Sequence, residues 1–335
     1  MAEWRRPGPS TTSPRTRGAG RWLYRRARKR IVRPLFRRLY RDTDRDVRKS
    51  ILIAGTGRSG TTWLADVLSA MLPCRVMFEP FHCDFIEAFR DFHYFHYARP
   101  EEPDDRLLSF CQTVFSGSIR HPWIDSGVGH LLPKCRVIKE IRANLFLRWI
   151  RERFPGLPIL FLLRHPCAVV LSRIRSRWAT DSDIAPFLAQ EKLVEDHLRE
   201  RLDLIRGARR EEEKHAVVWC VSNLVPLAQF GPGELDIFFY ERLCTQPEPE
   251  VRRMVRILSE GSFEADGAKL GRALRRIDIP SGTTLRSSAV ITGEDPVGRW
   301  RRDLSQDQIA NILGVVDAFG LGHLYGDSVL PQTDH

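Results

Sequence analysis

A glycine-rich turn directly after an apolar run constrains the fold of this chain more than any other feature. The run "ILIA" at residues 51–54 leads into Gly55, and Gly60 follows after four intervening residues. This is the G-x-x-x-x-G spacing of loops that hold a phosphate between a strand and a helix. Gly55, Gly57 and Gly60 let the backbone turn sharply and direct several N–H groups at one anion. The sequence therefore predicts a strand, an anion-binding loop and a helix that begins at Thr61.

The loop departs from the pattern of nucleoside triphosphatases directly after Gly60. Those enzymes place a lysine there to reach the β- and γ-phosphates, but this chain has Thr61 and Thr62, and the cation inside its loop is Arg58. No acidic residue after a predicted strand makes a convincing metal site. We therefore expect the loop to bind a terminal phosphate or sulfate without a metal ion, through Arg58, the threonine hydroxyls and backbone N–H groups.

A second candidate anion site follows the apolar stretch at residues 158–163. Arg164 ends this predicted strand, Pro166 is well placed to open a helix, and Ser172 lies eight residues after Arg164 on that helix. An arginine at a strand end and a hydroxyl on the next helix can hold a second phosphate, separate from the one in the first loop. Either motif alone also fits a surface arginine and a helix-filling serine. Together the two motifs indicate a nucleotide that is phosphorylated at both ends.

Short β-rich runs alternate with helical stretches along the chain. The predicted strands lie at residues 51–55, 74–78, 136–141, 158–164 and 235–240, and the predicted helices at 61–72, 166–178 and, in two stretches, about 184–230. This order predicts an α/β fold with a central, mostly parallel sheet flanked by helices, which binds ligands at the carboxyl ends of its strands. We expect a basic N-terminal arm at 1–50, a catalytic domain at 51–325 and a C-terminal tail at 326–335.

The positive charge of the chain is concentrated in the arm. Residues 1–50 contain 17 Lys and Arg against 4 Asp and Glu, whereas residues 51–335 contain 36 against 38. Because apolar residues recur every four positions among the arginines, we expect a disordered start at residues 1–20 and then a basic amphipathic helix at about 21–41, kinked near Pro34. Such a helix suits an anionic membrane surface, and packing on the chain's own body is the alternative. Nucleic acid is not an expected partner, since no recognition module accompanies the arm.

Cysteine usage and hydropathy predict the location of the protein. The seven cysteines are widely spaced, include no C-x-x-C pair and are odd in number, which favours reduced thiols and a reducing compartment. No apolar run reaches the roughly 18 residues of a membrane span, and the N-terminus lacks the apolar core of a signal peptide. We therefore expect a cytoplasmic protein that is peripheral at the inner membrane face if its arm binds lipid.

The two anion motifs together resemble those of the sulfotransferase family, whose donor is 3′-phosphoadenosine 5′-phosphosulfate (PAPS). In that family a strand-loop-helix of the form [K/R]-x-G-T-T holds the 5′-phosphosulfate, which corresponds here to Arg58-Ser59-Gly60-Thr61-Thr62. An Arg and a Ser eight residues apart hold the 3′-phosphate, which corresponds to Arg164 and Ser172. The resemblance spans roughly residues 50–320, and "GEDPVGRWRRDLS" is similar to the family's donor-covering loop. It implies in-line sulfuryl transfer from PAPS without a metal. Arg58 and the loop N–H groups are then expected to stabilise charge on the leaving phosphate as a catalytic role, with Arg299 as a further donor contact.

A second resemblance concerns the base that takes the proton of the acceptor hydroxyl. The segment "RVMFEPFH" resembles the F-E-P stretch after the second strand of carbohydrate-type sulfotransferases, whereas cytosolic members carry Lys at the position of Arg58 and use a histidine base. This makes Glu79 the candidate base, and its position just past an apolar strand predicts a partly raised pKa. A loop cap or an arginine partner is the alternative role of Glu79, and His82 and His165 are the other candidate bases. The implied acceptor is a carbohydrate or glycolipid-like molecule.

Other residues near these motifs have less specific roles. Lys139, just inside a predicted strand, can approach the sulfuryl group or an acidic acceptor. The aromatic-rich segment 92–97 is expected to line the acceptor entrance. His93 and His96 within it do not by themselves make a metal site, because no partner cluster accompanies them.

Two alternatives come from other functional classes. A divergent P-loop kinase requires ATP and Mg²⁺, and a membrane-docked nucleotide-binding protein without catalysis binds the donor but does not turn it over. Arg164 and Ser172 favour a sulfotransferase over both, because a kinase does not need to hold a 3′-phosphate.

Overall fold

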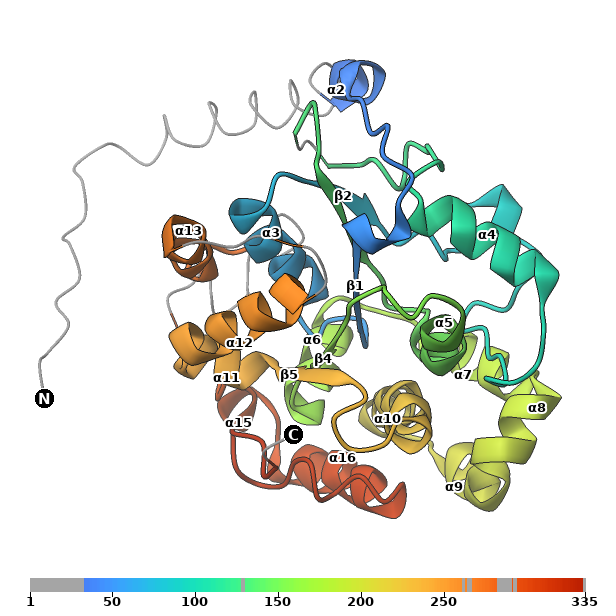
Figure 1. Ribbon diagram of the computed structural model, residues 1–335. Helices are drawn as coiled ribbons and strands as arrows, with labels where there is room; N and C mark the ends of the chain where they lie inside the picture. The colour runs from blue at the N-terminus through green and yellow to red at the C-terminus, as the bar shows by residue number, and fades with distance from the viewer. Residues whose placement is uncertain are drawn as a thin grey trace, which may run out of the picture.

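The strands in the described part of the chain form one five-stranded sheet in the order β2-β3-β1-β4-β5. The computed structural model describes residues 33–127, 130–260, 263, 267–281, 291 and 294–333. Each neighbouring pair of strands in this sheet runs parallel. Figure 1 shows helices on both sides of the sheet, which confirms the predicted α/β fold.

The elements follow one another in the alternating order that the sequence predicts. The strands are β1 (Ser50–Gly55), β2 (Cys74–Phe78), β3 (Cys135–Lys139), β4 (Ile159–Leu163) and β5 (Asp236–Phe239). The helices are α2 (Arg33–Leu39), α3 (Thr61–Met71), α4 (Asp105–Phe115), α5 (Leu147–Arg153), α6 (Pro166–Arg175), α7 (Asp181–Leu188), α8 (Glu191–Leu193), α9 (Leu202–Gly207), α10 (Glu211–Gln229), α11 (Tyr240–Thr245), α12 (Pro247–Glu260), α13 (Gly267–Ile277), α15 (Trp300–Asp303) and α16 (Gln306–Ala318). The 3₁₀ turns are η2 (Val47–Lys49), η3 (Glu87–Phe89), η4 (Asn144–Phe146) and η6 (Arg199–Arg201), and η5 (Val194–Leu198) is a π-helical turn.

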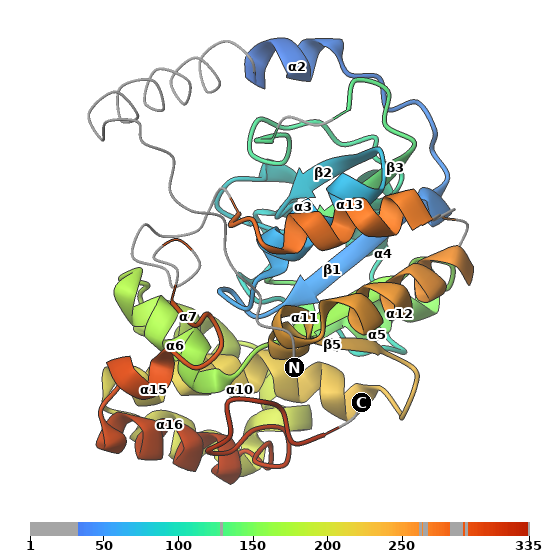
Figure 2. The same ribbon diagram turned by 90° about the vertical axis from the view of Figure 1, so that its left-hand side faces the viewer.

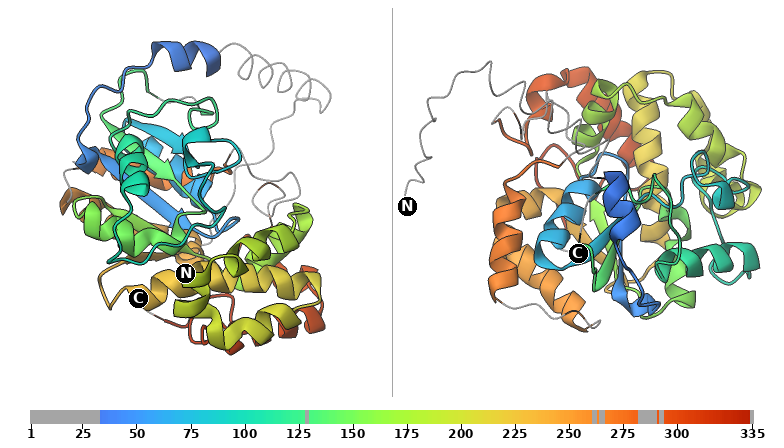
Figure 3. Two further views of the ribbon diagram at one scale, coloured as in Figure 1. Left: turned by 90° about the vertical axis from the view of Figure 1, so that its right-hand side faces the viewer. Right: turned by 90° about the horizontal axis from the view of Figure 1, so that it is seen from above.

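Helices cover both faces of the sheet because successive residues of a strand point to opposite sides. Ile51 and Ile53 of β1 belong to one core with α3, α11, α12 and α13, which lie in front of the sheet in Figure 2. Leu52 and Ala54 belong to the other core with α4, α5, α6, α10 and α16, and the left view of Figure 3 shows that side. Burial on both faces explains why residues 51–54 of β1 are all apolar.

Two predicted elements end earlier than expected, and both endings bear on the site. The predicted strand at 136–141 ends at Lys139, and the predicted helix at 166–178 ends at Arg175. Ile141 and Trp178 therefore lie in turns, and both line the cavity described below.

The end of the predicted arm is anchored inside the body. The carboxylate of Asp42 accepts hydrogen bonds from Arg75 Nη1 at 3.1 Å and from Arg136 Nη2 at 2.8 Å, and all three side chains are buried. The ring of Tyr40 is also buried, with the guanidinium groups of Arg75 and Arg120 at 5.0 and 4.2 Å from its centroid. Tyr40 and Asp42 thus tie the segment before β1 to the sheet.

The structure describes only the end of the predicted amphipathic helix, as α2. The predicted helix before residue 33 and the predicted disordered start lie outside the described residues, and the division into arm, domain and tail stays a prediction. Leu35 and Leu39 of α2 are about half exposed, so this part of the apolar stripe does not pack fully on the body. Among the described residues, no helix has both the length and the apolar character needed to cross a bilayer.

Cys74 and Cys135 form a disulfide at the amino ends of β2 and β3, which contradicts the expectation of seven reduced thiols. The two residues are register partners in the parallel pair, with their Cα atoms 4.4 Å apart, although 61 positions separate them in sequence. Pairing created by the fold is invisible to a count of sequence spacings. The free cysteines are Cys83, Cys111, Cys167, Cys220 and Cys244.

Candidate active site

A cavity of about 830 Å³ opens at the carboxyl edge of the sheet. Each strand contributes to its wall a residue at or just past its carboxyl end, namely Gly57, Glu79, Lys139, Arg164 and Tyr240. Ligands of parallel α/β sheets bind at this edge. The predicted site residues that line the cavity are Gly57, Arg58, Gly60, Thr61, Thr62, Glu79, Arg164, Ser172 and Arg299.

The loop between β1 and α3 has the backbone that its glycines predict. Gly60 has φ 105°, and α3 begins at the next residue, Thr61. A Cβ atom on Gly57 would lie 2.5 Å from Cζ3 of Trp178, so a larger residue cannot fit there without displacing the indole. Arg58 has φ 80°, a conformation that costs a non-glycine residue about 1 to 3 kcal/mol and that concentrates at functional sites.

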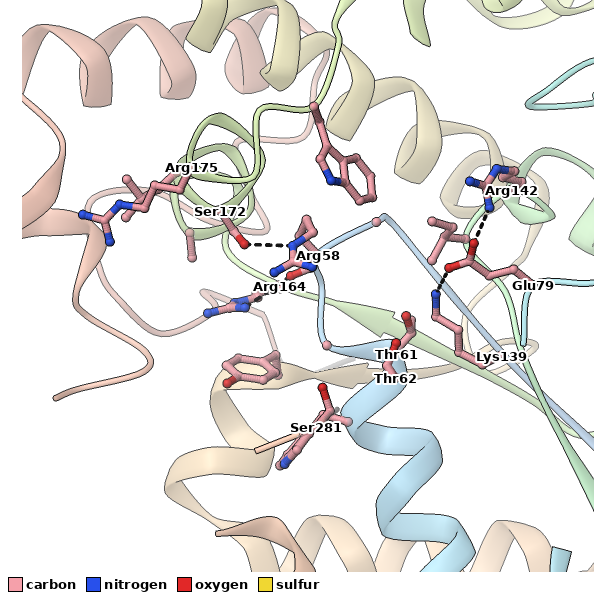
Figure 4. Close-up of a pocket in the computed structure, with 18 of the residues that line it drawn as sticks. Arg58, Thr61, Thr62, Glu79, Lys139, Arg142, Arg164, Ser172, Arg175 and Ser281 are labelled. Carbon is pink, nitrogen blue, oxygen red and sulfur yellow. Dashed lines mark hydrogen bonds and ion pairs between the residues drawn. The ribbon is translucent and has the colours of Figure 1, made fainter. Parts of the chain in front are cut away.

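Arg58, Arg164 and Ser172 meet at one place, as Figure 4 shows. Arg58 Nε donates to Ser172 Oγ at 3.0 Å, and Arg164 Nη1 donates to the carbonyl of Arg58 at 3.2 Å. The Arg164 guanidinium lies 4.0 Å from the ring centroid of Tyr240, and its Nη2 donates to the carbonyl of Pro296 at 3.1 Å. Because β1 and β4 are neighbours, the two predicted phosphate sites adjoin, and the Arg58 side chain points to the second site rather than along its own loop.

Two polar atoms in this region are buried without a hydrogen-bond partner, Ser59 Oγ and Arg164 Nε. Buried polar groups are normally bonded, and Arg164, unlike Ser59, lines the cavity, so its Nε is available to a ligand there. Burial, followed by the charges of Arg164 and Arg173, lowers the pKa of Arg58. Since an anion offsets both the repulsion and the missing bonds, this group of donors fits a phosphorylated nucleotide.

Glu79 lies just past β2 in ion pairs with two buried cations. Lys139 Nζ donates to its Oε1, and Arg142 Nη1 donates to its Oε2 at 2.7 Å. Burial raises the pKa of Glu79, but the charges and hydrogen bonds of Lys139 and Arg142 outweigh burial and hold the pKa at about 2. The predicted partly raised pKa is therefore wrong for this structure. The cause is a pair of cations from β3 and the turn after it, one of them the arginine partner considered from the sequence.

The backbone holds Glu79 as firmly as the ion pairs do. Glu79 has φ 46°, its N–H donates to the Lys139 carbonyl at 2.8 Å, and its own carbonyl accepts from Trp123 Nε1 at 3.3 Å. Arg58 and Glu79 thus both have a positive φ at the cavity. Strain of this kind persists only where the surrounding contacts enforce it.

Aromatic side chains surround the Glu79 end of the cavity. Phe78, Tyr94 and Trp123 line it, and the ring of Phe85 stacks on Trp123 with centroids 4.2 Å apart. Arg142 Nη2 donates to the hydroxyl of Tyr94 at 2.6 Å, which connects this wall to the ion-pair cluster. Of the predicted entrance segment, Tyr94 lines the cavity, whereas two of its other aromatic residues are buried in the core.

His82 and His165, the other candidate bases, are both buried. His82 Nδ1 lacks a hydrogen-bond partner and lies 3.9 Å from Asp84 Oδ2, and burial lowers the pKa of His82 to about 4. His165 Nδ1 accepts from the N–H of Cys167 at the start of α6, and its ring stacks on Trp300 with centroids 4.3 Å apart. Burial lowers the pKa of His165 to about 4 as well. These contacts give His165 a role in capping α6.

Arg299 reaches the cavity wall in ion pairs with two carboxylates. Its Nη1 lies 2.8 Å from Glu294, and its Nε lies 2.5 Å from Asp303. Arg175, one helical turn after Ser172, lies 2.9 Å from the same Asp303 and also lines the cavity. The sequence reading missed Arg175, although its i, i+3 spacing from Ser172 places the two on one face of a helix.

Three further cavity residues were also missed: Trp63, Arg142 and Tyr240. Trp63 directly follows the threonine pair, which is a usable signal. Arg142 directly follows a predicted strand, and Tyr240 is the last residue of one, as Arg164 is, so attention to every strand end would have found both.

Nothing in the described part of the chain gathers three or more His, Cys, Asp or Glu side chains around a possible metal position. The rings of His93 and His96 stack with centroids 6.2 Å apart. Burial lowers the pKa of His96 to about 4, which keeps the imidazole neutral.

Comparison with known families decides the assignment. A family model described as the sulfotransferase family matches residues 50–261. The chain belongs to the sulfotransferase family. The match includes both phosphate motifs and the Glu79 segment of this sulfotransferase, whereas Arg299 lies beyond it.

Solved structures of other sulfotransferases resemble this one at low sequence identity. A mouse sulfotransferase complexed with PAP has 13% identity and a TM-score of 0.45, with 83% of this chain and 86% of that chain covered. The sulfotransferase domain from the curacin biosynthetic pathway has 16% identity and a TM-score of 0.41, with coverage of 81% and 96%. A sulfotransferase from Alicyclobacillus acidocaldarius has 15% identity and a TM-score of 0.33, with coverage of 75% and 98%. No curated protein sequence matches the chain. The assignment to the family therefore depends on the family match.

Proposed function

We propose that this sulfotransferase transfers a sulfuryl group from PAPS to a hydroxyl of a carbohydrate or glycolipid-like acceptor. The observation that carries the proposal is the meeting of Arg58, Arg164 and Ser172 beside buried donors that lack partners. A nucleotide with phosphate groups at both its 3′ and 5′ ends matches two adjoining sites, because each phosphate requires its own charged donors. A nucleotide with a 5′-phosphate alone leaves one of these sites without a partner.

The phosphate groups of the donor are assigned to the two motifs. Residues 57–62 bind the 5′-phosphosulfate with backbone N–H groups and hydroxyls at the amino end of α3. Arg164 and Ser172 bind the 3′-phosphate, and Arg58 lies between the two groups. Arg299 contributes a further contact to the donor. The negative charge of the donor then competes for Arg299 with Glu294 and Asp303, the two carboxylates that form ion pairs with it in the free enzyme.

Two aromatic rings near the phosphate motifs suit the adenine of the donor. The rings of Trp63 and Tyr240 lie with centroids 5.4 Å apart at an interplanar angle of 62°. Trp63 Nε1 donates to the carbonyl of Ile277 at 3.0 Å, which fixes the indole. A rigid aromatic wall stacks on a purine at little entropic cost.

The transfer itself requires in-line geometry and stabilisation of charge on the leaving phosphate. The acceptor oxygen forms a bond to sulfur while the bond from sulfur to the phosphate oxygen breaks, and the hydroxyl proton passes to Glu79. Backbone N–H groups of the loop stabilise the leaving phosphate, and Lys139 stabilises the transferred group. The products are the sulfated acceptor and 3′,5′-adenosine bisphosphate.

The low pKa of Glu79 in the free enzyme is compatible with its role as base. The ammonium group of Lys139 stabilises the ionised carboxylate of Glu79, which makes this carboxylate a weak base in the free enzyme. An anionic phosphosulfate near Lys139 competes with Glu79 for that ammonium group. Donor binding therefore raises the pKa of Glu79 and makes it a better proton acceptor when the acceptor hydroxyl arrives.

Aromatic side chains support the proposed acceptor, and the basic N-terminal segment supports the proposed location. Phe78, Tyr94 and Trp123 offer ring faces on which a sugar can stack beside Glu79. The basic segment at residues 21–41 is proposed to contact an anionic membrane, which places the enzyme at the inner face of the cytoplasmic membrane. The disulfide removes the cysteine argument for a cytoplasmic location, so the charge pattern of the arm is the remaining support.

Turnover of sulfur-labelled PAPS over a panel of sugars, glycolipids, phenols and steroids tests the proposal. We expect labelled product from a sugar hydroxyl, release of 3′,5′-adenosine bisphosphate and no loss of rate in a chelator. Transfer to phenols or steroids alone contradicts the acceptor class, and stimulation by ATP and Mg²⁺ contradicts the donor. Donor binding without any transfer indicates a nucleotide-binding protein.

A further inference from the structure

Four exposed leucines lie on α2 and on the segment that precedes β3. Leu35 and Leu39 lie one turn apart on α2, and Leu131 and Leu132 precede β3; their exposed fractions are 53%, 51%, 52% and 72%. A hydrogen bond of 2.8 Å from the Arg41 N–H to the Leu131 carbonyl joins the two segments. Figures 1 and 2 both show α2 beside the segment that leads into β3, at the β2 edge of the sheet.

This clustering is unusual for the molecule. The described residues include eight large hydrophobic side chains that are exposed, and half of them lie here. Single exposed leucines need no explanation, but a group drawn from two segments marks an interaction surface.

Exposed cations lie on the same two segments as the leucines. Arg38 and Arg41 on one segment and Lys134 on the other are exposed. Residues 1–32, which lead into α2, add ten Lys and Arg against one Glu. Exposed leucines and cations on the same segments match the interface of an anionic bilayer, where leucines enter the acyl boundary and cations meet the headgroups.

We infer that α2 and residues 130–134 form one docking face, which binds the headgroup region of an anionic lipid bilayer. The inference rests on the proposed membrane contact of residues 21–41 and adds a second segment from the catalytic body. Nucleic acid fits this face less well, because phosphate backbones attract the cations but leave the four leucines in water.

A contact through the body fixes the orientation of the enzyme, which contact through the arm alone does not. Leu132 lies just before the amino end of β3, and Lys139 at the carboxyl end of that strand reaches the cavity. The strand separates them by about 13 Å, at roughly 3.3 Å per residue. The cavity thus opens at the end of the sheet away from the docking face, where it receives dissolved donor and glycans that extend from the bilayer.

Vesicle flotation of the full chain tests the docking face, with phosphatidylcholine vesicles that contain either no phosphatidylserine or about 30%. We expect binding that requires phosphatidylserine and weakens with salt. The double variant Leu131→Asp/Leu132→Asp replaces apolar insertion by two anions, so its affinity should fall roughly 10²-fold. Leu330→Asp is the matched control, since Leu330 is also exposed but lies in the C-terminal segment, and it should bind like the wild type.

Three outcomes overturn the inference. The first is a double variant that thermal melting shows to be folded and that binds vesicles as well as the wild type does. The second is a wild type that does not bind vesicles. The third is a wild type that light scattering shows to be a dimer and that does not bind vesicles, together with a double variant that is a monomer, because a second copy of the chain then occupies the face. Donor affinity and sulfuryl transfer to a soluble acceptor are measured in the same preparations. Both should be unchanged in the double variant, which separates failure of docking from failure of the proposed reaction.

Discussion

Replacement of Arg164 by alanine gives the most direct test of the donor site, because it needs no knowledge of the acceptor. The Arg164 guanidinium is positioned by the Tyr240 ring and by the carbonyls of Arg58 and Pro296, while its Nε is buried without a partner. A phosphate group of the ligand that accepts a hydrogen bond from the Arg164 guanidinium gains a charge-assisted hydrogen bond. Loss of such a bond costs about 1.5 to 3 kcal/mol, or roughly 10- to 150-fold in Kd.

Two nucleotides isolate this contribution. The molecules 3′,5′-adenosine bisphosphate and 5′-AMP differ by the 3′-phosphate alone, so the ratio of their Kd values reports the second phosphate site. Calorimetric titration at one fixed salt concentration should show a strong preference for the bisphosphate in the wild type. In Arg164→Ala that preference should shrink by the factor given above, while 5′-AMP binding changes little.

Arg253 supplies a matched control on α12. Its guanidinium lies 3.8 Å from the ring centroid of Phe238 and donates to the carbonyl of Ile237, so its surroundings resemble those of Arg164, but it does not line the cavity. Arg253→Ala should alter stability without altering the nucleotide preference. An unchanged preference in Arg164→Ala, or a wild type that binds both nucleotides equally, would refute the assignment of the 3′-phosphate.

Three other substitutions address the chemistry and the loop. Glu79→Gln should keep donor affinity and lower turnover roughly 10²- to 10⁴-fold; near-normal turnover excludes Glu79 as the base. Burial raises the pKa of Glu79, but Lys139 and Arg142 hold it at about 2, so Glu79 ionisation should give the wild type no acid limb in kcat/KM above about pH 3. Lys139→Met removes one of these cations and therefore raises the Glu79 pKa. As the pH is lowered, the activity of this variant should begin to fall at a higher pH than that of the wild type. An acid limb at the wild-type pH contradicts the effect of Lys139 on the Glu79 pKa. Gly57→Val should weaken donor binding because its side chain meets Trp178, and addition of Trp178→Ala should restore part of the donor affinity if the clash is the cause.

The sequence predicted the parts of the site that depend on local geometry. A strand that ends in glycines before a helix folds in one way, so the loop at residues 55–62 and the start of α3 at Thr61 appear where expected. Arg164 and Ser172 were also found, since a strand end and the following helix turn fix their separation. These predictions needed no knowledge of which strands are neighbours.

Features that depend on strand order were beyond the sequence. Arg58 turns toward Ser172 because β1 and β4 are adjacent. Glu79 has a low pKa because β2 and β3 pair, which brings Lys139 within reach across 60 positions. Burial alone raises the pKa of a carboxylate that follows an apolar strand. Only the pairing of the strands reveals the cations that reverse the direction of this pKa shift.

The disulfide between Cys74 and Cys135 divides the enzyme in a way that the strand order does not show. It closes a covalent ring that contains Glu79, Tyr94 and Trp123, whereas the donor motifs lie outside it. In the chain-entropy model, closure of a ring of this size lowers the conformational entropy of the unfolded chain and thereby stabilises the folded state by about 4 kcal/mol. The region that we propose binds the acceptor is thus a tethered loop. A protease that cuts within the ring leaves both new ends attached to the sheet, and insertions there can change the proposed acceptor surface without loosening the donor framework.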